Sequence, residues 1–528
     1  MAGETFLRGA FILTVAGMLV KVLGSVSRIF ISRVLGGEGV GLYQMAYPIY
    51  LLITSISSAG IPVAISILVS ERLALGDLKG AQKTFKISLS MMIVTGLFFS
   101  ALLYFGAGWL VKNEIVRDSR AYWSLVVLTP AVFFATILAS FRGYFQGFQK
   151  MMPTAVSQIV EQLVRVVTMI ALSYLLLSYG LEYGAAGAAF GASPGAFTGL
   201  LVLLFFYFRH KRAQAMPEAY LQEQPSQSLK TGQLAKKLIQ LAIPVSLANI
   251  MVPLVSSIDA LIVPMRLEVA GFAIKEATTL FGYLTGMALP LVMMATIPTA
   301  SLALSIVPAV SEAHALNDKT VLAQRINSGM RLTGIIVVPC FLGMFVLARP
   351  ISVLLYASPE AWLCIAIMSV SIFFLGMHQV TTAVLQGLGK ATIAMINMVL
   401  SALVKVVFAW IFTALPLWNI AGAAWASVLD FALAATLNLF FLYKYAGFVL
   451  NFTSLGKIFT SGLVMAASAY GTYFICAGAF GNNLSTLLAV IAGGIVYFAM
   501  LLLLGLVTKG EVNKLPIVGK YLGKFLKE

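Results

Sequence analysis

The chain has 528 residues, of which 60% are hydrophobic and 10% are charged. Together with a mean hydropathy of +0.96, this composition excludes a soluble globular protein. The formal net charge of +16 at pH 7 would suggest a nucleic-acid partner for a soluble chain. In a membrane protein, however, basic residues gather in cytoplasmic loops and near anionic headgroups. We therefore expect the lipid bilayer as a partner and no nucleic acid.

Apolar runs of about 20 residues, long enough to cross a hydrocarbon core of about 30 Å, recur along the whole chain. They are continuous rather than alternating, which favours transmembrane helices over a barrel. We predict an all-α polytopic membrane protein with about 14 transmembrane helices. In the first half, spans are expected at about 9–34, 42–70, 85–111, 121–141, 154–179 and 185–208.

A polar segment rich in Gln, Lys and Ser follows the sixth span and predicts a linker. Six further spans are expected near 238–264, 279–308, 327–348, 359–384, 392–414 and 420–443, and two more near 455–478 and 484–507. The last segment mixes lysines with Leu, Ile and Phe, which is typical of an amphipathic helix on the inner leaflet. The predicted domains are an N-terminal six-helix lobe (1–208), a cytoplasmic linker (209–237), a C-terminal six-helix lobe (238–445), an extra helix pair (446–508) and an amphipathic basic tail (509–528).

Two pairs of similar segments indicate an internal repeat. Gln146 to Arg165 reads QGFQKMMPTAVSQIVEQLVR, and Gln386 to Lys405 reads QGLGKATIAMINMVLSALVK. VSERLALGD, ending at Asp77, is echoed by VSEAHALND, ending at Asp318. Both pairs have nearly the same displacement, so we predict a duplicated unit of roughly 240 residues.

Each predicted repeat has an even number of spans, so both halves enter the membrane in the same direction and are related by an axis along the membrane normal. With a cytoplasmic amino terminus, most of the 35 Lys and Arg residues fall in cytoplasmic segments. We therefore predict a multi-pass protein of the cell (cytoplasmic) membrane with both termini in the cytoplasm. The first apolar run is too long for a cleaved signal and is expected to remain as the first span.

Ionisable residues inside predicted spans cost roughly 2.5–3.5 kcal/mol each on insertion scales and need a partner or a wet cavity. Lys21 and Arg28 lie seven residues apart, on one face of the first helix. No acid lies on their own helix, which favours a role in binding an anionic substrate. Glu161 and Arg165 are four residues apart on the fifth helix, so a structural ion pair is the alternative for them.

The other intramembrane charges also have explanations that involve no substrate. Lys405 of the eleventh span either faces a cavity or neutralises Asp430 of the twelfth. Arg33 and Arg266 lie at the predicted outer rim, where their side chains can snorkel to the interface. The excess of cations predicts a cavity that attracts an anionic group such as a pyrophosphate. The candidate cavity cations are Lys21, Arg28, Arg165 and Lys405, and the candidate acids for pairing or ion coupling are Glu161, Asp259 and Asp430.

No motif for catalysis is present. The chain has no phosphate-binding GxxxxGK[ST] and no His-rich metal motif. Its three cysteines and three histidines are too scattered for a metal site or a disulfide framework. We predict a protein that is not an enzyme, with no catalytic residue, metal or cofactor; an ion gradient, the membrane potential or the substrate gradient supplies its energy.

Three segments resemble a known family. These are TFLRGAFILTVAGMLVKVLGSVSRIFISRVLGGEGVGLYQMAYPIY at the amino terminus, PVAISILVSERLALGD after it, and SQIVEQLVR in the fifth span. They are similar to the stage V sporulation protein B family of polysaccharide transporters, in the multidrug/oligosaccharidyl-lipid/polysaccharide exporter superfamily. The resemblance covers essentially the whole chain. It implies two six-helix MATE-like lobes around a central cavity, an extra helix pair and alternating access.

That family is related to the MurJ-type lipid II flippases, whose charged motifs are only partly present. Where those flippases carry an arginine before V-L-G in the first helix, this chain has Lys21. Their following Arg-Asp pair is replaced by Ser27 and Arg28, and an Asp-Arg pair of the eighth helix by Leu284 and Thr285. The resemblance therefore implies a cation in the first helix and identifies neither the glycan nor a coupling ion.

The expected function is a membrane flippase that moves an anionic lipid-linked cell-wall precursor from the inner to the outer leaflet. Lipid II or a lipid-linked oligosaccharide is the expected substrate, used in spore cortex peptidoglycan synthesis, and cell-wall synthesis enzymes are further candidate partners. The alternative is a cation-coupled multidrug exporter on the same scaffold. A scaffold that recruits cell-wall enzymes without transport is the third hypothesis.

Overall fold

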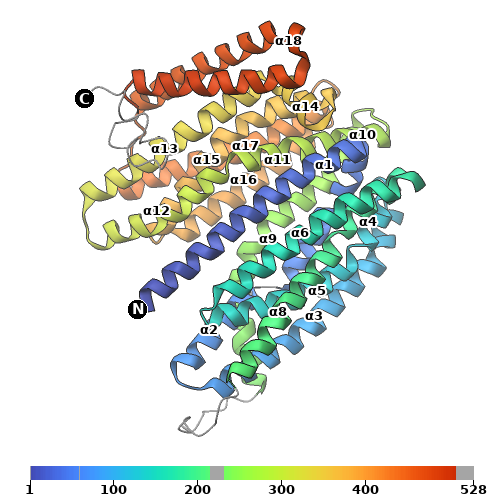
Figure 1. Ribbon diagram of the computed structural model, residues 1–528, viewed down its shortest axis with the longest axis vertical. Helices are drawn as coiled ribbons and strands as arrows, with labels where there is room; N and C mark the ends of the chain where they lie inside the picture. Colours follow the sequence, from blue (N-terminus) through green and yellow to red (C-terminus); the bar gives the residue numbers. More distant parts are fainter. Residues whose placement is uncertain (1, 59, 215–230, 507–528) are drawn as a thin grey trace. The chain divides into compact units, whose positions relative to one another are not determined.

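The computed structural model describes residues 2–58, 60–214 and 231–506. All regular secondary structure in these residues is helical (Figure 1), and twelve segments are long and apolar enough to cross a membrane. The predicted all-α polytopic membrane fold is therefore confirmed. The predicted amphipathic tail and most of the predicted linker lie outside the described residues.

The chain divides into two compact units. The first contains the residues up to Met287 together with Thr413–Leu417. Its helices are α1 (Ala2–Ser58), α2 (Ile61–Ala74), α3 (Leu78–Lys112), η1 (Ser119–Ala121), α4 (Tyr122–Val126), α5 (Thr129–Gly147), α6 (Met151–Leu176), η2 (Leu177–Tyr179), α7 (Leu181–Phe190), α8 (Ala192–Gln214), α9 (Thr231–Val269) and α10 (Ile274–Phe281), followed by the π-helical segment η4 (Gly282–Ala288).

The second unit contains Ala288–Phe412 and the residues from Trp418 onward. Its helices are α11 (Leu289–Ala295), α12 (Ile297–Ala315), α13 (Lys319–Val346), α14 (Ala348–Tyr356), η5 (Pro359–Ala361), α15 (Trp362–Gly387), α16 (Ala391–Phe412), α17 (Asn419–Ala446) and α18 (Phe452–Leu503).

Two of the twelve segments are long enough for two crossings each. Ile12–Ala74 has 63 residues and Phe452–Leu503 has 52, so a straight helix of either length would measure roughly 80–95 Å, more than twice the hydrocarbon core. Each contains a glycine with a non-helical backbone, Gly36 (φ 65°) and Gly481 (φ 70°). Glycine adopts a positive φ without a Cβ clash, so one residue suffices to bend the helix. Counted as two crossings each, these segments raise the number to the predicted fourteen.

The boundary between the compact units falls between Met287 and Ala288, one residue before the end of η4. The sequence repeat instead places the start of the C-terminal lobe near residue 238. In the structure α9 and α10 pack against α1, and α9 also packs against α2. The first two elements after the predicted linker therefore belong to the first compact unit.

The two pairs of echoed segments have matching backbone conformations. The turn before α3 has a positive φ at Gly76 (74°), and the turn before α13 has one at Asn317 (54°). In the other pair, Gln149 before α6 (55°) and Gly389 before α16 (72°) correspond in the same way. Asparagine tolerates this left-handed conformation better than most residues, whereas Gln149 adopts it at a cost.

In each unit, the segment that ends at Asp77 or Asp318 packs against the segment that begins at Gln146 or Gln386. A Cβ on Gly147, at the end of α5, would lie 2.7 Å from the Val69 Cβ atom of α2. A Cβ on Gly387, at the end of α15, would lie 2.9 Å from the Val310 Cβ atom of α12. Such distances are too short for a side chain, so glycine is needed at both places. The matching packing supports the duplication that the sequence predicts.

An aspartate caps the start of α3 in the first unit and the start of α13 in the second. Asp77 accepts a hydrogen bond from the Gly80 N–H at 2.7 Å. Asp318 accepts bonds from the Thr320 and Val321 N–H groups, both at 3.0 Å. These bonds satisfy backbone donors that the first turn of a helix leaves free.

We predict that Asp318→Ala destabilises the protein by about 1 kcal/mol, because α13 loses its N-terminal cap. Asp318 is the cleaner of the two sites, since Asp77 also pairs with Arg72 at 3.2 Å. The measurement is the thermal-unfolding midpoint of the purified protein in detergent. Asp318→Asn keeps a capping oxygen and should retain most of the stability; an equal fall in both variants would contradict the capping role.

Candidate functional site

A carboxylate of the first unit lies between two guanidinium groups. Glu161 of α6 accepts a hydrogen bond at its Oε2 atom from Arg142 Nη2 of α5, at 2.7 Å. Its Oε1 atom is 3.5 Å from Arg165 Nη2, one turn along α6. Arg142 Nε also donates to Ser157 Oγ at 3.2 Å. One acid therefore serves two cations, and its shorter contact is with Arg142.

Three tyrosines of α1 lie beside Arg165. Tyr43, Tyr47 and Tyr50 follow one another at intervals of four and three residues, which places them on one face of the helix. The Tyr43 and Tyr47 rings are stacked with centroids 5.1 Å apart, and the Tyr47 and Tyr50 centroids are 5.6 Å apart. Arg165 Nη1 donates to the Tyr47 hydroxyl at 3.2 Å.

The hydrogen-bonding capacity of Arg165 is not exhausted by these contacts. Its Nε atom is buried and has no hydrogen-bond partner among the described residues. A guanidinium offers five N–H donors in a planar fork that matches carboxylate and phosphate oxygens. The protein encloses this Nε donor in the present conformation, so an anion reaches it only after neighbouring side chains move.

The predicted cations of the first helix lie on the part of α1 that precedes the bend at Gly36. Lys21 is exposed and Arg28 is half-buried, and neither forms an ion pair with the described residues of the first unit. Arg28 and Arg165 are both near enough to Tyr43 for their charges to act on its hydroxyl. The structure thus brings Arg28 and Arg165 to the same tyrosine, and Lys21 lies two turns away along α1.

Close packing of α1 on α6 positions this group. A Cβ on Gly24 would lie 3.4 Å from the Nε2 atom of Gln162, which neighbours Glu161. Lys21, Arg28, Arg142 and Arg165 together carry four positive charges against the single negative charge of Glu161. An excess of this size in a membrane-spanning bundle is stabilised by water or by an anion.

The remaining predicted residues lie elsewhere. Asp259 and Arg266 are half-buried on α9, and Arg33 is exposed on α1. In the second unit Lys405 of α16 is buried, and Asp430 of α17 accepts a hydrogen bond from Ser401 Oγ at 2.7 Å. The proposed neutralisation of Asp430 by Lys405 remains a prediction. No group of three His, Cys, Asp or Glu side chains suited to a metal ion occurs in the described ranges.

Arg142 and the tyrosines are not among the residues predicted from the sequence. The predicted end of the fourth span at residue 141 places Arg142 in a loop, whereas α5 continues to Gly147. The spacing of the aromatic residues in YQMAYPIY is the signal that marks the tyrosine face.

Residues 6–301 match the family model described as "Polysaccharide biosynthesis protein", and residues 244–411 match the MatE model. The chain is 33% identical to stage V sporulation protein B of Bacillus subtilis (strain 168), over 98% of this chain and 99% of that protein. It is 28% identical to the lipid II flippase MurJ of the same organism, over 84% of this chain and 83% of that protein.

A solved structure of the lipid II flippase MurJ in an inward closed conformation has the same fold. It superposes with a TM-score of 0.69 at 15% sequence identity, covering 93% of this chain and 98% of that chain. The match of the family model to more than half of the chain and the end-to-end similarity to stage V sporulation protein B carry the assignment. The chain belongs to the polysaccharide biosynthesis protein family, whose members are multi-pass membrane transporters related to MurJ and MATE proteins and not enzymes.

Proposed function

We propose that the protein is a flippase for an anionic lipid-linked cell-wall precursor. The substrate is lipid II or a similar lipid-linked oligosaccharide, moved from the inner to the outer leaflet by alternating access in spore cortex peptidoglycan synthesis. The similarity to stage V sporulation protein B and to a lipid II flippase supports this class of substrate. Cell-wall synthesis enzymes are the further partners that such a role implies.

The observation that carries the proposal is the excess of positive charge beside the tyrosines of α1. A lipid-linked precursor carries its negative charge on phosphate groups next to the sugar. The guanidinium groups of Arg28 and Arg165 suit such a group, because charge-assisted hydrogen bonds to phosphate are short and strong. Lys21 on the same α1 segment adds a third cation, and we assign Lys405 of the second unit to the same substrate.

The competing hypothesis is a cation-coupled drug exporter, which the match to the MatE model favours. That function requires an acid free to bind a proton, a sodium ion or a cationic drug. Glu161 already contacts two guanidinium groups, at 2.7 and 3.5 Å, which makes it a poor site for a further cation. Asp259 and Asp430 are the other acids that this hypothesis names.

Transport follows from the predicted orientation, in which both termini are cytoplasmic. The phosphate headgroup enters from the cytoplasm and meets Lys21, Arg28 and Arg165, while the lipid tail stays in the bilayer. Rearrangement of the helices then exposes the headgroup on the outer side. The apolar surface of the spans keeps the tail in lipid throughout, so only the polar headgroup crosses the protein.

The test is reconstitution of the purified chain in liposomes that contain fluorescent lipid II. We predict that the protein makes headgroups of the inner leaflet accessible to a membrane-impermeant quencher, and that empty liposomes do not. Ethidium uptake by the same liposomes, with an imposed proton or sodium gradient, measures drug transport. Ethidium movement without lipid II movement would overturn the flippase proposal in favour of the exporter.

A further inference from the structure

A lysine and a histidine of the first unit meet where α5 ends and α6 begins. The Nζ atom of Lys150, the residue before α6, lies 2.9 Å from the Nδ1 atom of His210 near the end of α8. An ammonium group has no lone pair and can only donate, so Nδ1 accepts the hydrogen bond and the imidazole is neutral. Two protonated groups at this distance would repel each other. The pair therefore carries one positive charge and not two.

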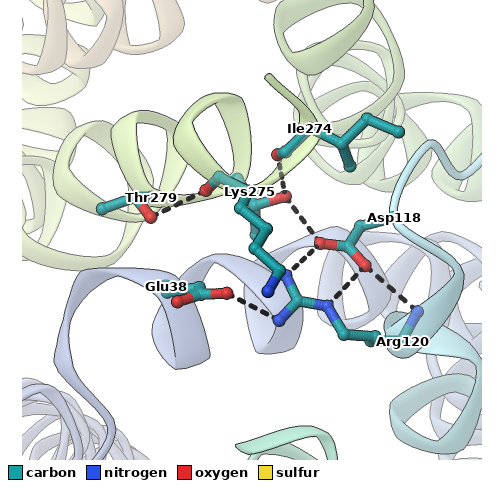
Figure 2. A network of polar contacts seen from close by, with 7 residues as sticks. Glu38, Asp118, Arg120, Ile274, Lys275 and Thr279 are labelled. Atoms are coloured by element: carbon teal, nitrogen blue, oxygen red, sulfur yellow. Dashed lines mark hydrogen bonds and ion pairs between the residues drawn. The ribbon is translucent and has the colours of Figure 1, made fainter. Parts of the chain in front are cut away.

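The contact between Lys150 and His210 differs from an ordinary ion pair. Figure 2 shows such a pair, in which the Arg120 guanidinium donates to the Asp118 carboxylate at 2.7 Å and to Glu38 at 2.6 Å. Two acids there balance the charge of one cation. His210 accepts a hydrogen bond from Lys150 but brings no opposite charge, so it holds the side chain in place without balancing the ammonium group.

The turn that carries Lys150 is fixed by backbone hydrogen bonds. The N–H groups of Phe148, Gln149 and Lys150 donate to carbonyl groups at the end of α5, at 3.1, 2.9 and 2.9 Å. The His210 ring packs edge-on against the Phe148 ring of the same turn, with centroids 5.0 Å apart. A second ring, that of Tyr144 in α5, lies 6.4 Å from the His210 ring in a similar orientation. The two nitrogen atoms are therefore held together by their surroundings.

Several features favour the neutral amine of Lys150. Partial burial of the ammonium group lowers the pKa of Lys150 below its ordinary value. The lysine stands directly before the first turn of α6, where the helix dipole disfavours a positive charge. Arg209 and Lys211, the exposed neighbours of His210, add further positive charge to the end of α8. A lysine that is desolvated or close to other cations becomes a nucleophile, because the neutral amine is its reactive form.

His210 places a base within reach of this amine. When an amine attacks a carbonyl group, its nitrogen becomes acidic and must lose a proton. The Nδ1 atom of His210 is 2.9 Å from the Nζ atom of Lys150, a distance at which a general base takes a proton. An unperturbed imidazole has a pKa of about 6.5 and is mostly neutral in slightly alkaline solution. Lys150 thus has both properties of an activated nucleophile, a favoured neutral form and an adjacent base.

The second unit contains the same turn without the histidine. The N–H groups of Leu388, Gly389 and Lys390 donate to carbonyl groups at the end of α15, at 3.0, 3.0 and 2.8 Å. Lys390 therefore takes the place of Lys150 in the repeat. Its Nζ atom lies over the Tyr445 ring of α17, 5.0 Å from the centroid. An aromatic face attracts the ammonium form and accepts no proton, so Lys390 is a matched lysine without a base.

We propose that Lys150 is a modification site at which small acyl phosphates acylate the amine, with His210 as the base. The neutral Nζ atom attacks the acyl carbonyl, an N–C bond forms, and the C–O bond to the phosphate breaks. Phosphate leaves with the electron pair, and the amine proton passes to Nδ1 and then to water. The basic end of α8 favours an anionic donor, and in the predicted orientation this turn faces the cytoplasm. The product is an uncharged amide, so the modification removes a cation from the start of α6.

The test is mass spectrometry of the purified chain after incubation with acetyl phosphate in detergent at about pH 8, where an unperturbed imidazole is neutral. We expect Lys150 to be acetylated roughly tenfold faster than Lys390, since a general base acts on Lys150 alone of the two. His210→Gln keeps a polar side chain without a base and should lower the Lys150 rate roughly tenfold, while the Lys390 rate stays unchanged. Equal rates at the two lysines of the unchanged chain, or an undiminished Lys150 rate in the His210→Gln variant, would overturn the proposal.

This test is independent of transport. The comparison of Lys150 with Lys390 needs only the unchanged chain, so it does not depend on whether the His210→Gln variant folds. A chain that moves lipid II but acetylates the two lysines equally would fail only the modification proposal. A chain that acetylates Lys150 selectively but moves no lipid II would fail only the substrate proposal.

Discussion

Glu161→Gln is expected to destabilise the protein by about 3 kcal/mol, because two arginines lose their shared carboxylate inside the bundle. Arg142 loses a contact of 2.7 Å and Arg165 one of 3.5 Å. The amide of the variant occupies nearly the same volume, so the loss is one of charge and hydrogen bonding, not of packing. A fall in the thermal-unfolding midpoint of the purified protein is the measurement.

A double variant separates this charge effect from simple damage to the helix. Glu161→Gln/Arg142→Gln removes the acid and the arginine that lies closer to it, so one uncompensated cation fewer remains. We expect it to be more stable than Glu161→Gln alone. A Glu161→Gln variant as stable as the wild-type chain would contradict the central position of this carboxylate, and a double variant less stable than the single one would contradict the charge explanation.

The sequence leaves two roles open for Glu161 and Arg165, a structural ion pair or a substrate site. The distances around Glu161 help to decide between them. A structural pair within α6 requires the carboxylate to face Arg165 first. In the structure its closer partner is Arg142, and the Nε atom of Arg165 remains without a partner in the described residues. The structural role therefore suits the Glu161–Arg142 pair, and Arg165 is the cation better placed for a substrate.

The architecture was predictable from the sequence because hydrophobic length determines how often a chain crosses a bilayer. Helix ends were less predictable. The expected loop between the first two spans is a bend at Gly36 within α1, since a single glycine with a positive φ replaces several loop residues. The same uncertainty hid Arg142, which lies more than a turn inside α5.

The candidate site was predictable only in part, because partners on different helices cannot be paired from one sequence. Lys21, Arg28 and Arg165 could be predicted as candidates, because a cation inside a membrane span needs a partner or water. Tyr47 was not, since a tyrosine in an apolar helix is usually a packing residue. The close approach of Gly41 to the Thr278 carbonyl was equally hidden, because the role of a spaced glycine is apparent only when the facing helix is known.

Charge reversal at Arg28 is expected to reduce lipid II transport roughly hundredfold or more, because an acid at this position repels the phosphate that the arginine would bind. Arg28 is half-buried, and it interacts with Tyr43 together with Arg165, so Arg28→Glu also places a carboxylate near Glu161 of the same group. Lys21→Glu, two turns away on α1, should likewise abolish transport while the protein still inserts into the membrane. Initial rates of headgroup exposure in liposomes with fluorescent lipid II are the measurement.

Arg33→Glu is the matched control, since it makes the same change of charge on the same helix. Arg33 is exposed and lies closer to the bend at Gly36, and in the predicted orientation it belongs to the outer rim, away from the tyrosines. Its reversal should leave the rate within about threefold of the wild-type value, a difference of well under 1 kcal/mol. Arg28→Lys keeps a cation without the planar fork and should retain part of the activity. If Arg28→Glu and Arg33→Glu transport equally well, the cations beside the tyrosines of α1 do not bind the headgroup, and the flippase proposal loses the charge on which it depends.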